Sequence, residues 1–259
     1  MLRFLQILVL IIVASCAAPP PLSRPAAAPL PAAESCRLIL CRNVDYPWPW
    51  DSLQPWALSQ ELLIDSACQS WGVPPSQVQS LDGDPLPCLS LISDFEGPLL
   101  LAITGHVLEQ GQMLLPDRRR ISLPELISIL EQRQGPTWLI LDTCHAGFHQ
   151  PVAGSKLRIL SVCDASELSR EIRLSAARLP ELRREFSAGR QWIAQQYGRS
   201  SISPLGLALA QIESRGWPSG DLDAKLKAIV EEGRRLNSLP GFGNQSFDLR
   251  GFPNPPTGR

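Results

Sequence analysis

From residue 36 onward, short apolar segments alternate with amphipathic ones, and this alternation limits the fold more than any other sequence feature. The apolar segments have the length of strands, and most of them are hydrophobic at neighbouring positions and not only at every second one. Such strands are typical of a parallel sheet that helices cover on both faces. We therefore expect one α/β domain over residues 36–236. The expected strands are 36–41, 77–81, 99–104, 137–142 and 157–162.

Helix signals lie between and after these strands. Ser122 and Glu125 have the spacing of a capping box, which predicts that a helix begins there. Ser203-Pro204 predicts the start of another helix, and Gly216 predicts its end. Two more helices are expected from the apolar period of residues 56–71 and 221–236.

Two further segments differ in composition from the rest of the domain. Residues 167–200 hold seven Arg among several Glu, and we interpret them as a solvated helical insertion. A cleavage region or a contact with anionic lipid headgroups are the alternatives. Residues 237–259 are rich in Gly, Pro and Asn and are expected to be irregular.

The N-terminus has the pattern of an export signal. Arg3 precedes an apolar run over residues 4–13, which is too short to span a bilayer and fits a signal-peptide core. The run ends in Val13-Ala14-Ser15-Cys16, which resembles a bacterial lipobox. This resemblance implies that residues 1–15 are a lipoprotein signal peptide and that Cys16 is lipidated. An ordinary signal peptide cut near Ala18 is the alternative.

A Pro/Ala-rich stretch follows the lipobox over residues 16–35 and predicts an extended tether without a core of its own. Two or more acyl chains on Cys16 would anchor the chain stably in a membrane. We expect a bacterial cell-envelope location. Because Ala17, and not Asp, follows the Cys, similarity to lipoprotein sorting signals favours the outer membrane if the host is Gram-negative.

Charge and cysteine spacing argue against several classes of site. The net charge is -1, so no overall field favours nucleic acid as a partner. None of the seven Cys lies in a CxxC or Cys/His spacing, so no zinc site and no cofactor are expected. The 259 residues suffice for one sizeable core.

One His and one Cys directly follow two of the expected strands. His106 comes after strand 99–104 and Gly105, and Cys144 comes after strand 137–142 and Thr143. Parallel strands place functional groups at their carboxyl ends, so these side chains meet if the strands are neighbours. An imidazole beside a thiol can hold its proton and later protonate a leaving amine. A protonated His and a following helix N-terminus would both lower the pKa of the Cys.

The segments around these residues resemble the motifs of one peptidase family. TGHV at 104–107 resembles the SGHG motif of caspases and metacaspases, and LILDTCHAG at 139–147 resembles their DACHSG motif. MLLPD at 113–117 is similar to the YLLPxD that follows the His motif in metacaspases. The resemblance implies a caspase-like three-layer sandwich with a mostly parallel central sheet and helices on both faces. It also implies a cysteine-type endopeptidase that acts on protein or peptide substrates.

The resemblance further implies roles for single residues. Cys144 would be the nucleophile and His106 the general base, with backbone N–H groups of Cys144 and Val107 forming the oxyanion hole. Asp142 would line the S1 pocket and favour Arg or Lys in the substrate, with Asp45 as a second acid. His145, next to Cys144, is interpreted as a motif residue and not as the base.

Two departures from the family pattern keep alternatives open. Val107 stands where the family has Gly, and a β-branched residue resists positive φ. A catalytically inactive caspase-like binding or scaffold lipoprotein is therefore the alternative function. Arg118-Arg119-Arg120 stands after Asp117 without an acidic cluster, so calcium activation is not expected. The oligomeric state does not follow from the sequence.

Overall fold

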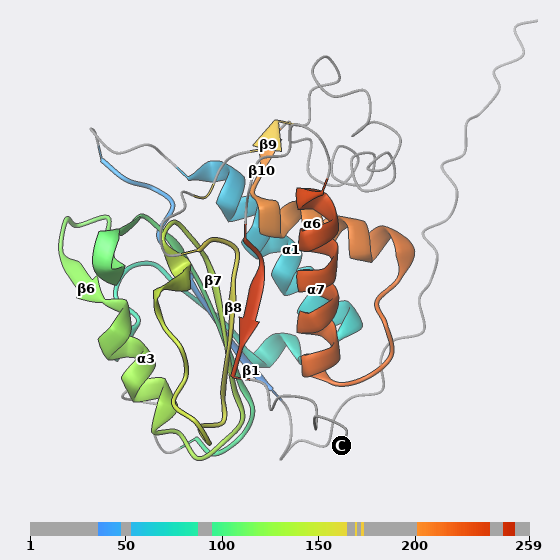
Figure 1. Cartoon of the computed structure of the whole chain (residues 1–259), viewed down its shortest axis with the longest axis horizontal. Coiled ribbons are helices and arrows are strands. Elements are labelled where there is room, and N and C mark those ends of the chain that lie inside the picture. The colour runs from blue at the N-terminus through green and yellow to red at the C-terminus, as the bar shows by residue number, and fades with distance from the viewer. Residues whose placement is uncertain are drawn as a thin grey trace, which may run out of the picture.

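The structure, a computed structural model, describes residues 36–47, 53–87, 95–164, 169, 172–173, 201–238 and 246–251. A six-stranded sheet forms its centre in the order β11-β8-β7-β3-β1-β2 (Figure 1). Its strands are β1 (Arg37–Arg42), β2 (Val78–Leu81), β3 (Leu99–Gly105), β7 (Thr137–Thr143), β8 (Leu157–Ser161) and β11 (Asp248–Arg250). The first five run parallel, and β11 pairs with β8 in the antiparallel direction.

Helices cover this sheet on both faces, as the alternating pattern predicts. The helix α3 (Leu123–Glu131) packs on one side, and α1 (Gln54–Ser70), α6 (Pro204–Arg215) and α7 (Leu222–Asn237) pack on the other (Figure 1). All seven residues of β3 are buried, so this strand contacts core on both faces. The expected fold class, α/β with a mostly parallel central sheet, is confirmed.

The helix boundaries follow the capping signals of the sequence. The Ser122 hydroxyl accepts a hydrogen bond from the Glu125 N–H, and the Ser203 hydroxyl accepts one from Gly206. Gly216 ends α6 with φ 97°, a conformation that residues with a side chain rarely adopt. The expected strands and helices are therefore confirmed with boundaries shifted by one or two residues.

Two expectations about composition-biased segments are wrong in part. Within 167–200, expected to be helical, Ile172–Arg173 form β9, which pairs antiparallel with β10 (Ser201–Ile202). Residues 237–259 were expected to be irregular, but β11 lies among them and extends the central sheet. Its main-chain pairing with β8 leaves no trace in the pattern of side chains. The other positions of 167–200 lie outside the described residues except for Ser169.

Three short strands that the sequence pattern did not predict follow β3. They are β4 (Val107–Leu108), β5 (Gln112–Leu114) and β6 (Arg120–Ser122), which form an antiparallel sheet in that order. This small sheet begins one residue after His106 and therefore fixes the chain on the carboxyl side of the His.

The N-terminal predictions concern residues 1–35, which lie outside the described residues. Cys16, the signal peptide and the tether are therefore not placed here. Within the described part of the chain, no helix has the length and apolar character needed to cross a membrane.

Candidate active site

Two neighbouring parallel strands bring the predicted His and Cys to the same edge of the sheet. β3 and β7 pair along their full length, and the last pair in the register is Gly105 with Thr143. His106 and Cys144 are the next residue on each strand. Because paired strands lie about 4.8 Å apart, the two backbones emerge side by side.

Tyr46, on the segment after β1, holds the backbone of His106. Its hydroxyl accepts a hydrogen bond from the His106 N–H at 3.0 Å and donates one to the Leu114 carbonyl at 2.8 Å. The two rings also meet edge to face, with centroids 4.6 Å apart. The His106 carbonyl accepts from the Leu114 N–H at 2.9 Å. Burial raises the pKa of Tyr46 to about 12, so its hydroxyl stays protonated and keeps donating to Leu114.

Gly105 leaves the space in which the Tyr46 hydroxyl lies. A Cβ at this position would come within 2.9 Å of the Tyr46 Oη and 3.1 Å of the Asn43 Cβ. The Gly of the TGH motif is therefore explained by close packing beneath the His. It does not take a positive φ, because Gly105 belongs to β3.

The thiol of Cys144 is half-buried and is contacted by the segment after β8. Its Sγ accepts a hydrogen bond from the Ser169 N–H at 3.3 Å. The Ser169 hydroxyl in turn accepts from the indole N–H of Trp56, on α1, at 3.2 Å. Trp56 thus anchors the residue that covers the sulfur.

The pKa of Cys144 differs from the expectation. Burial raises it, and the Ser169 N–H lowers it by less, while the nearby Asp142 charge raises it further. In the described part of the chain, β7 leads into a short 3-10 helix at Ala146–Phe148 and not into the expected α-helix. The predicted lowering of the Cys pKa is therefore wrong for the arrangement in this structure.

The backbone around both side chains shows how Val107 is accommodated. Val107 is buried and lies in β4 with an extended backbone, so its β-branched side chain meets no strain there. The left-handed conformation occurs instead at His145, with φ 52°, directly after Cys144. A His tolerates this region better than a β-branched residue does.

Asp142, the predicted S1 acid, lies at the base of this edge and is buried. Its Oδ2 accepts from the Ser203 hydroxyl at 2.8 Å, and Ser203 also lies 2.5 Å from the Ser59 hydroxyl. Its Oδ1 has no hydrogen-bond partner among the described residues. Burial raises the pKa of Asp142 to about 7, and the Ser203 bond opposes this rise.

Asp45, the second predicted acid, is exposed on the segment after β1. Its Oδ1 accepts from the Gln54 amide at 2.7 Å. Because β1 neighbours β3 in parallel, Asp45 emerges at the same sheet edge as His106. The structure therefore brings all predicted site residues except the lipidation site, Cys16, to one edge of the sheet.

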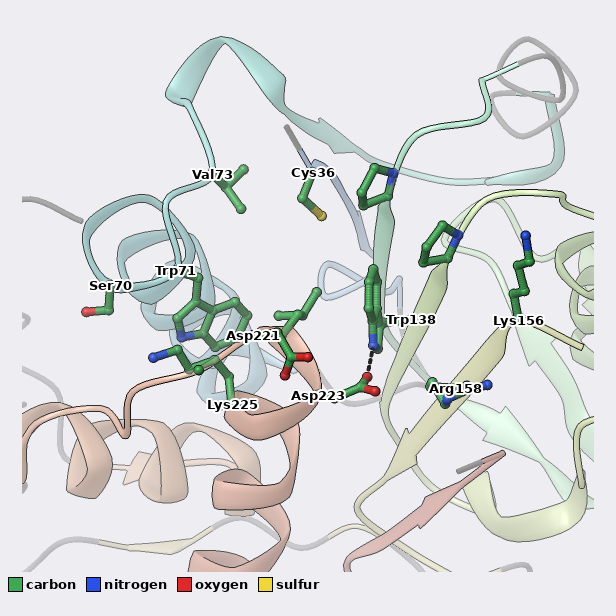
Figure 2. A pocket seen from close by; sticks show the side chains of 14 residues that line it. Cys36, Ser70, Trp71, Val73, Trp138, Lys156, Arg158, Asp221, Asp223 and Lys225 are labelled. Carbon is green, nitrogen blue, oxygen red and sulfur yellow. Dashed lines mark hydrogen bonds between the residues drawn. The ribbon is translucent and has the colours of Figure 1, made fainter. Parts of the chain in front are cut away.

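A well-defined cavity lies elsewhere. A cavity of about 680 Å³ lies at the amino ends of the strands (Figure 2). Cys36, Trp71 and Trp138 line it, and none of the predicted catalytic residues does. Geometry and chemistry place the candidate active site at the carboxyl edge, since that edge holds the paired His and Cys.

Within the described ranges, no group of three or more His, Cys, Asp or Glu side chains is arranged to hold a metal ion. The described site consists of a thiol, an imidazole, a tyrosine and two carboxyl groups. It therefore supports acid–base and nucleophilic chemistry by protein side chains.

Sequence reasoning missed three residues of this site. Tyr46 follows Asp45 directly, and an aromatic residue on the segment after β1 was the available signal. Ser203 was predicted as a helix start and not as the partner of Asp142, which is 61 residues away in the chain. Ser169 carries no sequence signal for its contact with Cys144.

A search of solved structures finds a match in the crystal structure of caspase-1 from Spodoptera frugiperda. The TM-score is 0.52 at 12% sequence identity, and the match covers 87% of this chain and 92% of that one. No protein-family model and no curated sequence matches the chain. At this identity the likeness establishes a caspase-like fold.

Proposed function

We propose that this chain is a cysteine-type endopeptidase in which Cys144 is the nucleophile and His106 its general base. The observation that carries the proposal is the register of β3 and β7, which ends in Gly105 paired with Thr143. It brings the two motif residues out side by side at the carboxyl edge of a caspase-like sheet.

The proposed mechanism uses the groups in the order that acyl transfer requires. His106 takes the proton of the Cys144 thiol as the sulfur attacks the scissile carbonyl, and then protonates the leaving amine. The N–H groups of Cys144 and Val107 receive the negative oxygen of the tetrahedral intermediate. Water then attacks the acyl-enzyme, with His106 again as base. The raised pKa of Cys144 means that its thiolate forms only when His106 accepts the proton.

We further propose that Asp142 selects Arg or Lys before the cleaved bond, with Asp45 at the pocket entrance. The free Oδ1 of Asp142 is a buried acceptor that a guanidinium could reach once the pocket opens. Because the pKa of Asp142 is about 7, binding of a cationic side chain would release a proton near neutral pH.

A peptidyl-arginyl chloromethylketone tests the proposed pair, with mass spectrometry to locate the adduct. We expect an adduct on Cys144 that is absent in His106→Ala, while the matched control His149→Ala keeps it. A peptide library with Cys144→Ala as the blank then gives the residue preferred before the cleaved bond. A folded protein that forms no Cys144 adduct would refute the peptidase proposal.

A second function, a caspase-like domain that binds without cleaving, is favoured by one observation. The Ser169 N–H contacts the sulfur, and Trp56 holds Ser169 in place. If this cover never leaves, substrate cannot reach Cys144. Retained binding of an uncleaved peptide in wild type and Cys144→Ala alike would favour this reading.

We also propose that lipid on Cys16 tethers the domain to a bacterial membrane through residues 16–35. Metabolic labelling with an alkyne-bearing fatty acid tests this, because Cys16→Ala should lose the label and Cys36→Ala should keep it. Membrane fractionation then tests the outer-membrane location. A label that persists in Cys16→Ala would contradict the tether.

A further inference from the structure

The cavity at the amino ends of the strands has the size and lining of a ligand pocket. Its volume of about 680 Å³ lies within the several hundred Å³ that small-molecule sites occupy. Four of its lining residues each stand directly before a strand of the central sheet: Cys36, Pro98, Pro136 and Lys156. We propose that this cavity binds a neutral molecule built on fused aromatic rings.

The lining of the cavity runs from the surface of the protein into its core. Pro136 and Lys156 are exposed, whereas Cys36 and Val73 are buried. Burial raises the pKa of the Cys36 thiol to about 12, so this group stays protonated and adds an uncharged wall. A ligand that enters from the exposed side therefore loses its contact with water at the buried side, which favours an apolar molecule.

Two partly exposed indole rings supply the aromatic walls of the cavity (Figure 2). The Trp138 N–H donates to the Asp223 carboxylate at 2.6 Å, and Trp71 packs edge to face on Trp217 with centroids 5.0 Å apart. These contacts hold both rings in place before any ligand arrives. Fixed indole rings favour a flat aromatic body, which gains ring contacts beyond the area that it buries.

The volume of the cavity limits the number of rings. An apolar cavity of about 150 Å³ in another protein holds one benzene molecule. The cavity described here has about 680 Å³, of which the part beside the exposed residues stays in contact with solvent. The remainder suffices for roughly two or three fused rings.

The neutral charge of the proposed ligand follows from the charged groups of the lining, which include acids and cations together. The two acids are engaged by N–H donors of the protein. Asp223 accepts from Trp138, and Asp221 accepts from the Ala224 N–H at 3.0 Å as the N-cap of α7. A cationic ligand would have to compete with these donors.

The cations of the lining are engaged as well. Lys225 donates to the Pro218 carbonyl, and burial lowers its pKa while the charge of the nearby Glu213 carboxylate opposes this shift. The other two donate to main-chain carbonyls: Lys156 to Gln134, and Arg158 to Ser155 and Leu157. An ion of either sign would be desolvated in this cavity without a partner of its own, whereas a neutral ring system would not.

This site is separate from the proposed peptidase chemistry. It lies at the amino ends of the strands, and His106 and Cys144 are not among its lining residues. Its test therefore uses binding alone and does not depend on the outcome for the peptidase.

The test is photocrosslinking with benzophenone, a neutral diaryl ketone, on the full chain in lipid nanodiscs, followed by peptide mapping. Two charged analogues are compared with it, the anion 4-benzoylbenzoate and the cation 4-(aminomethyl)benzophenone. At equal free aqueous concentrations, benzophenone should label the peptides that carry Trp71 and Trp138. Each charged analogue should label them roughly tenfold less, because its charge is desolvated without a partner.

Competition separates a ring system from a flexible chain. The neutral fused-ring compound 2-naphthol should displace benzophenone at a lower free concentration than 1-dodecanol, which is neutral but has an acyl-like tail. Displacement by 1-dodecanol at an equal or lower free concentration overturns the aromatic class of the ligand.

Two variants locate the site. Val73→Phe fills the cavity from its buried side, and Leu222→Trp fills it from the partly buried start of α7, so each should abolish the crosslinks. Glu231→Trp, at an exposed position of α7 outside the cavity, is the matched control. If Val73→Phe does not fold, the Leu222→Trp and Glu231→Trp pair still decides.

Each outcome decides the proposal. Labelling of the cavity peptides that prefers benzophenone to both charged analogues, and that Leu222→Trp abolishes while Glu231→Trp keeps it, supports the proposal. Equal or stronger labelling by either charged analogue, labelling that survives in Leu222→Trp, labelling elsewhere on the chain or no labelling at all overturns it.

Discussion

Replacing Asp142 with Asn should remove a pH dependence of stability that burial of this carboxyl creates. Asp142 is 2% exposed, and its pKa is raised from 3.8 to about 7 by burial, against the opposing Ser203 bond. Between these two pH values the folded chain holds a proton that the unfolded chain has lost. Stability therefore falls as pH rises from about 4 to 7.

The magnitude follows from the difference between the two pKa values. A difference of about three corresponds to about 4 kcal/mol of stability lost once Asp142 ionises. Most of the pH range between the two pKa values of Asp142 lies above pH 5. The free energy of unfolding should therefore fall by roughly 2–3 kcal/mol between pH 5 and pH 8. These figures are upper limits, because local opening lets water reach the ionised group.

Urea unfolding followed by circular dichroism between pH 5 and pH 8 measures this effect, in a Cys144→Ala background that prevents self-cleavage. The added Asp142→Asn change should flatten the pH dependence, because the amide stays neutral and its oxygen can still accept from Ser203. Asp82→Asn, at an exposed acid, should leave it unchanged. The reasoning is refuted if the pH dependence persists undiminished in Asp142→Asn.

Three further substitutions test how the site is held. Tyr46→Phe leaves the His106 N–H and the Leu114 carbonyl without the hydroxyl, so enzyme assays should show a lower kcat with KM little changed, and urea unfolding a loss of about 1–3 kcal/mol. Gly105→Ala places a Cβ against Tyr46, so urea unfolding should show a stability loss of about 1–3 kcal/mol. Trp56→Phe releases Ser169 from its anchor, so iodoacetamide should alkylate Cys144 severalfold faster than in wild type or in Trp71→Phe. An unchanged kcat, an unchanged midpoint or an unchanged alkylation rate, respectively, would contradict each expectation.

The central sheet could be predicted from the sequence because burial on both faces leaves a direct trace. β3 is almost wholly apolar and β7 has an apolar centre over 138–141, and strands of that kind are found in covered parallel sheets. The positions of His106 and Cys144 then followed from strand ends. The sequence does not show that β3 and β7 are neighbours in the sheet. The register of the two strands confirms this assumption.

The unpredicted parts depend on contacts between residues far apart in the chain. β11 joins the sheet through main-chain bonds to β8, and a three-residue strand carries too little pattern to be detected. The raised pKa of Cys144 depends on burial and on Ser169, which no local motif encodes. Tyr46 acts on His106 across 60 residues of sequence. Contacts between residues so far apart in the chain leave no local sequence pattern.

A double-mutant cycle on hydrolysis of an arginyl peptide tests most directly whether one sulfur and one imidazole work as a unit. We predict that Cys144→Ala and His106→Ala each lower kcat/KM by several orders of magnitude and that the double variant loses little more, since residues acting as a unit are not additive. Hydrolysis that survives in Cys144→Ala, or losses that simply add in the double variant, would contradict the pairing.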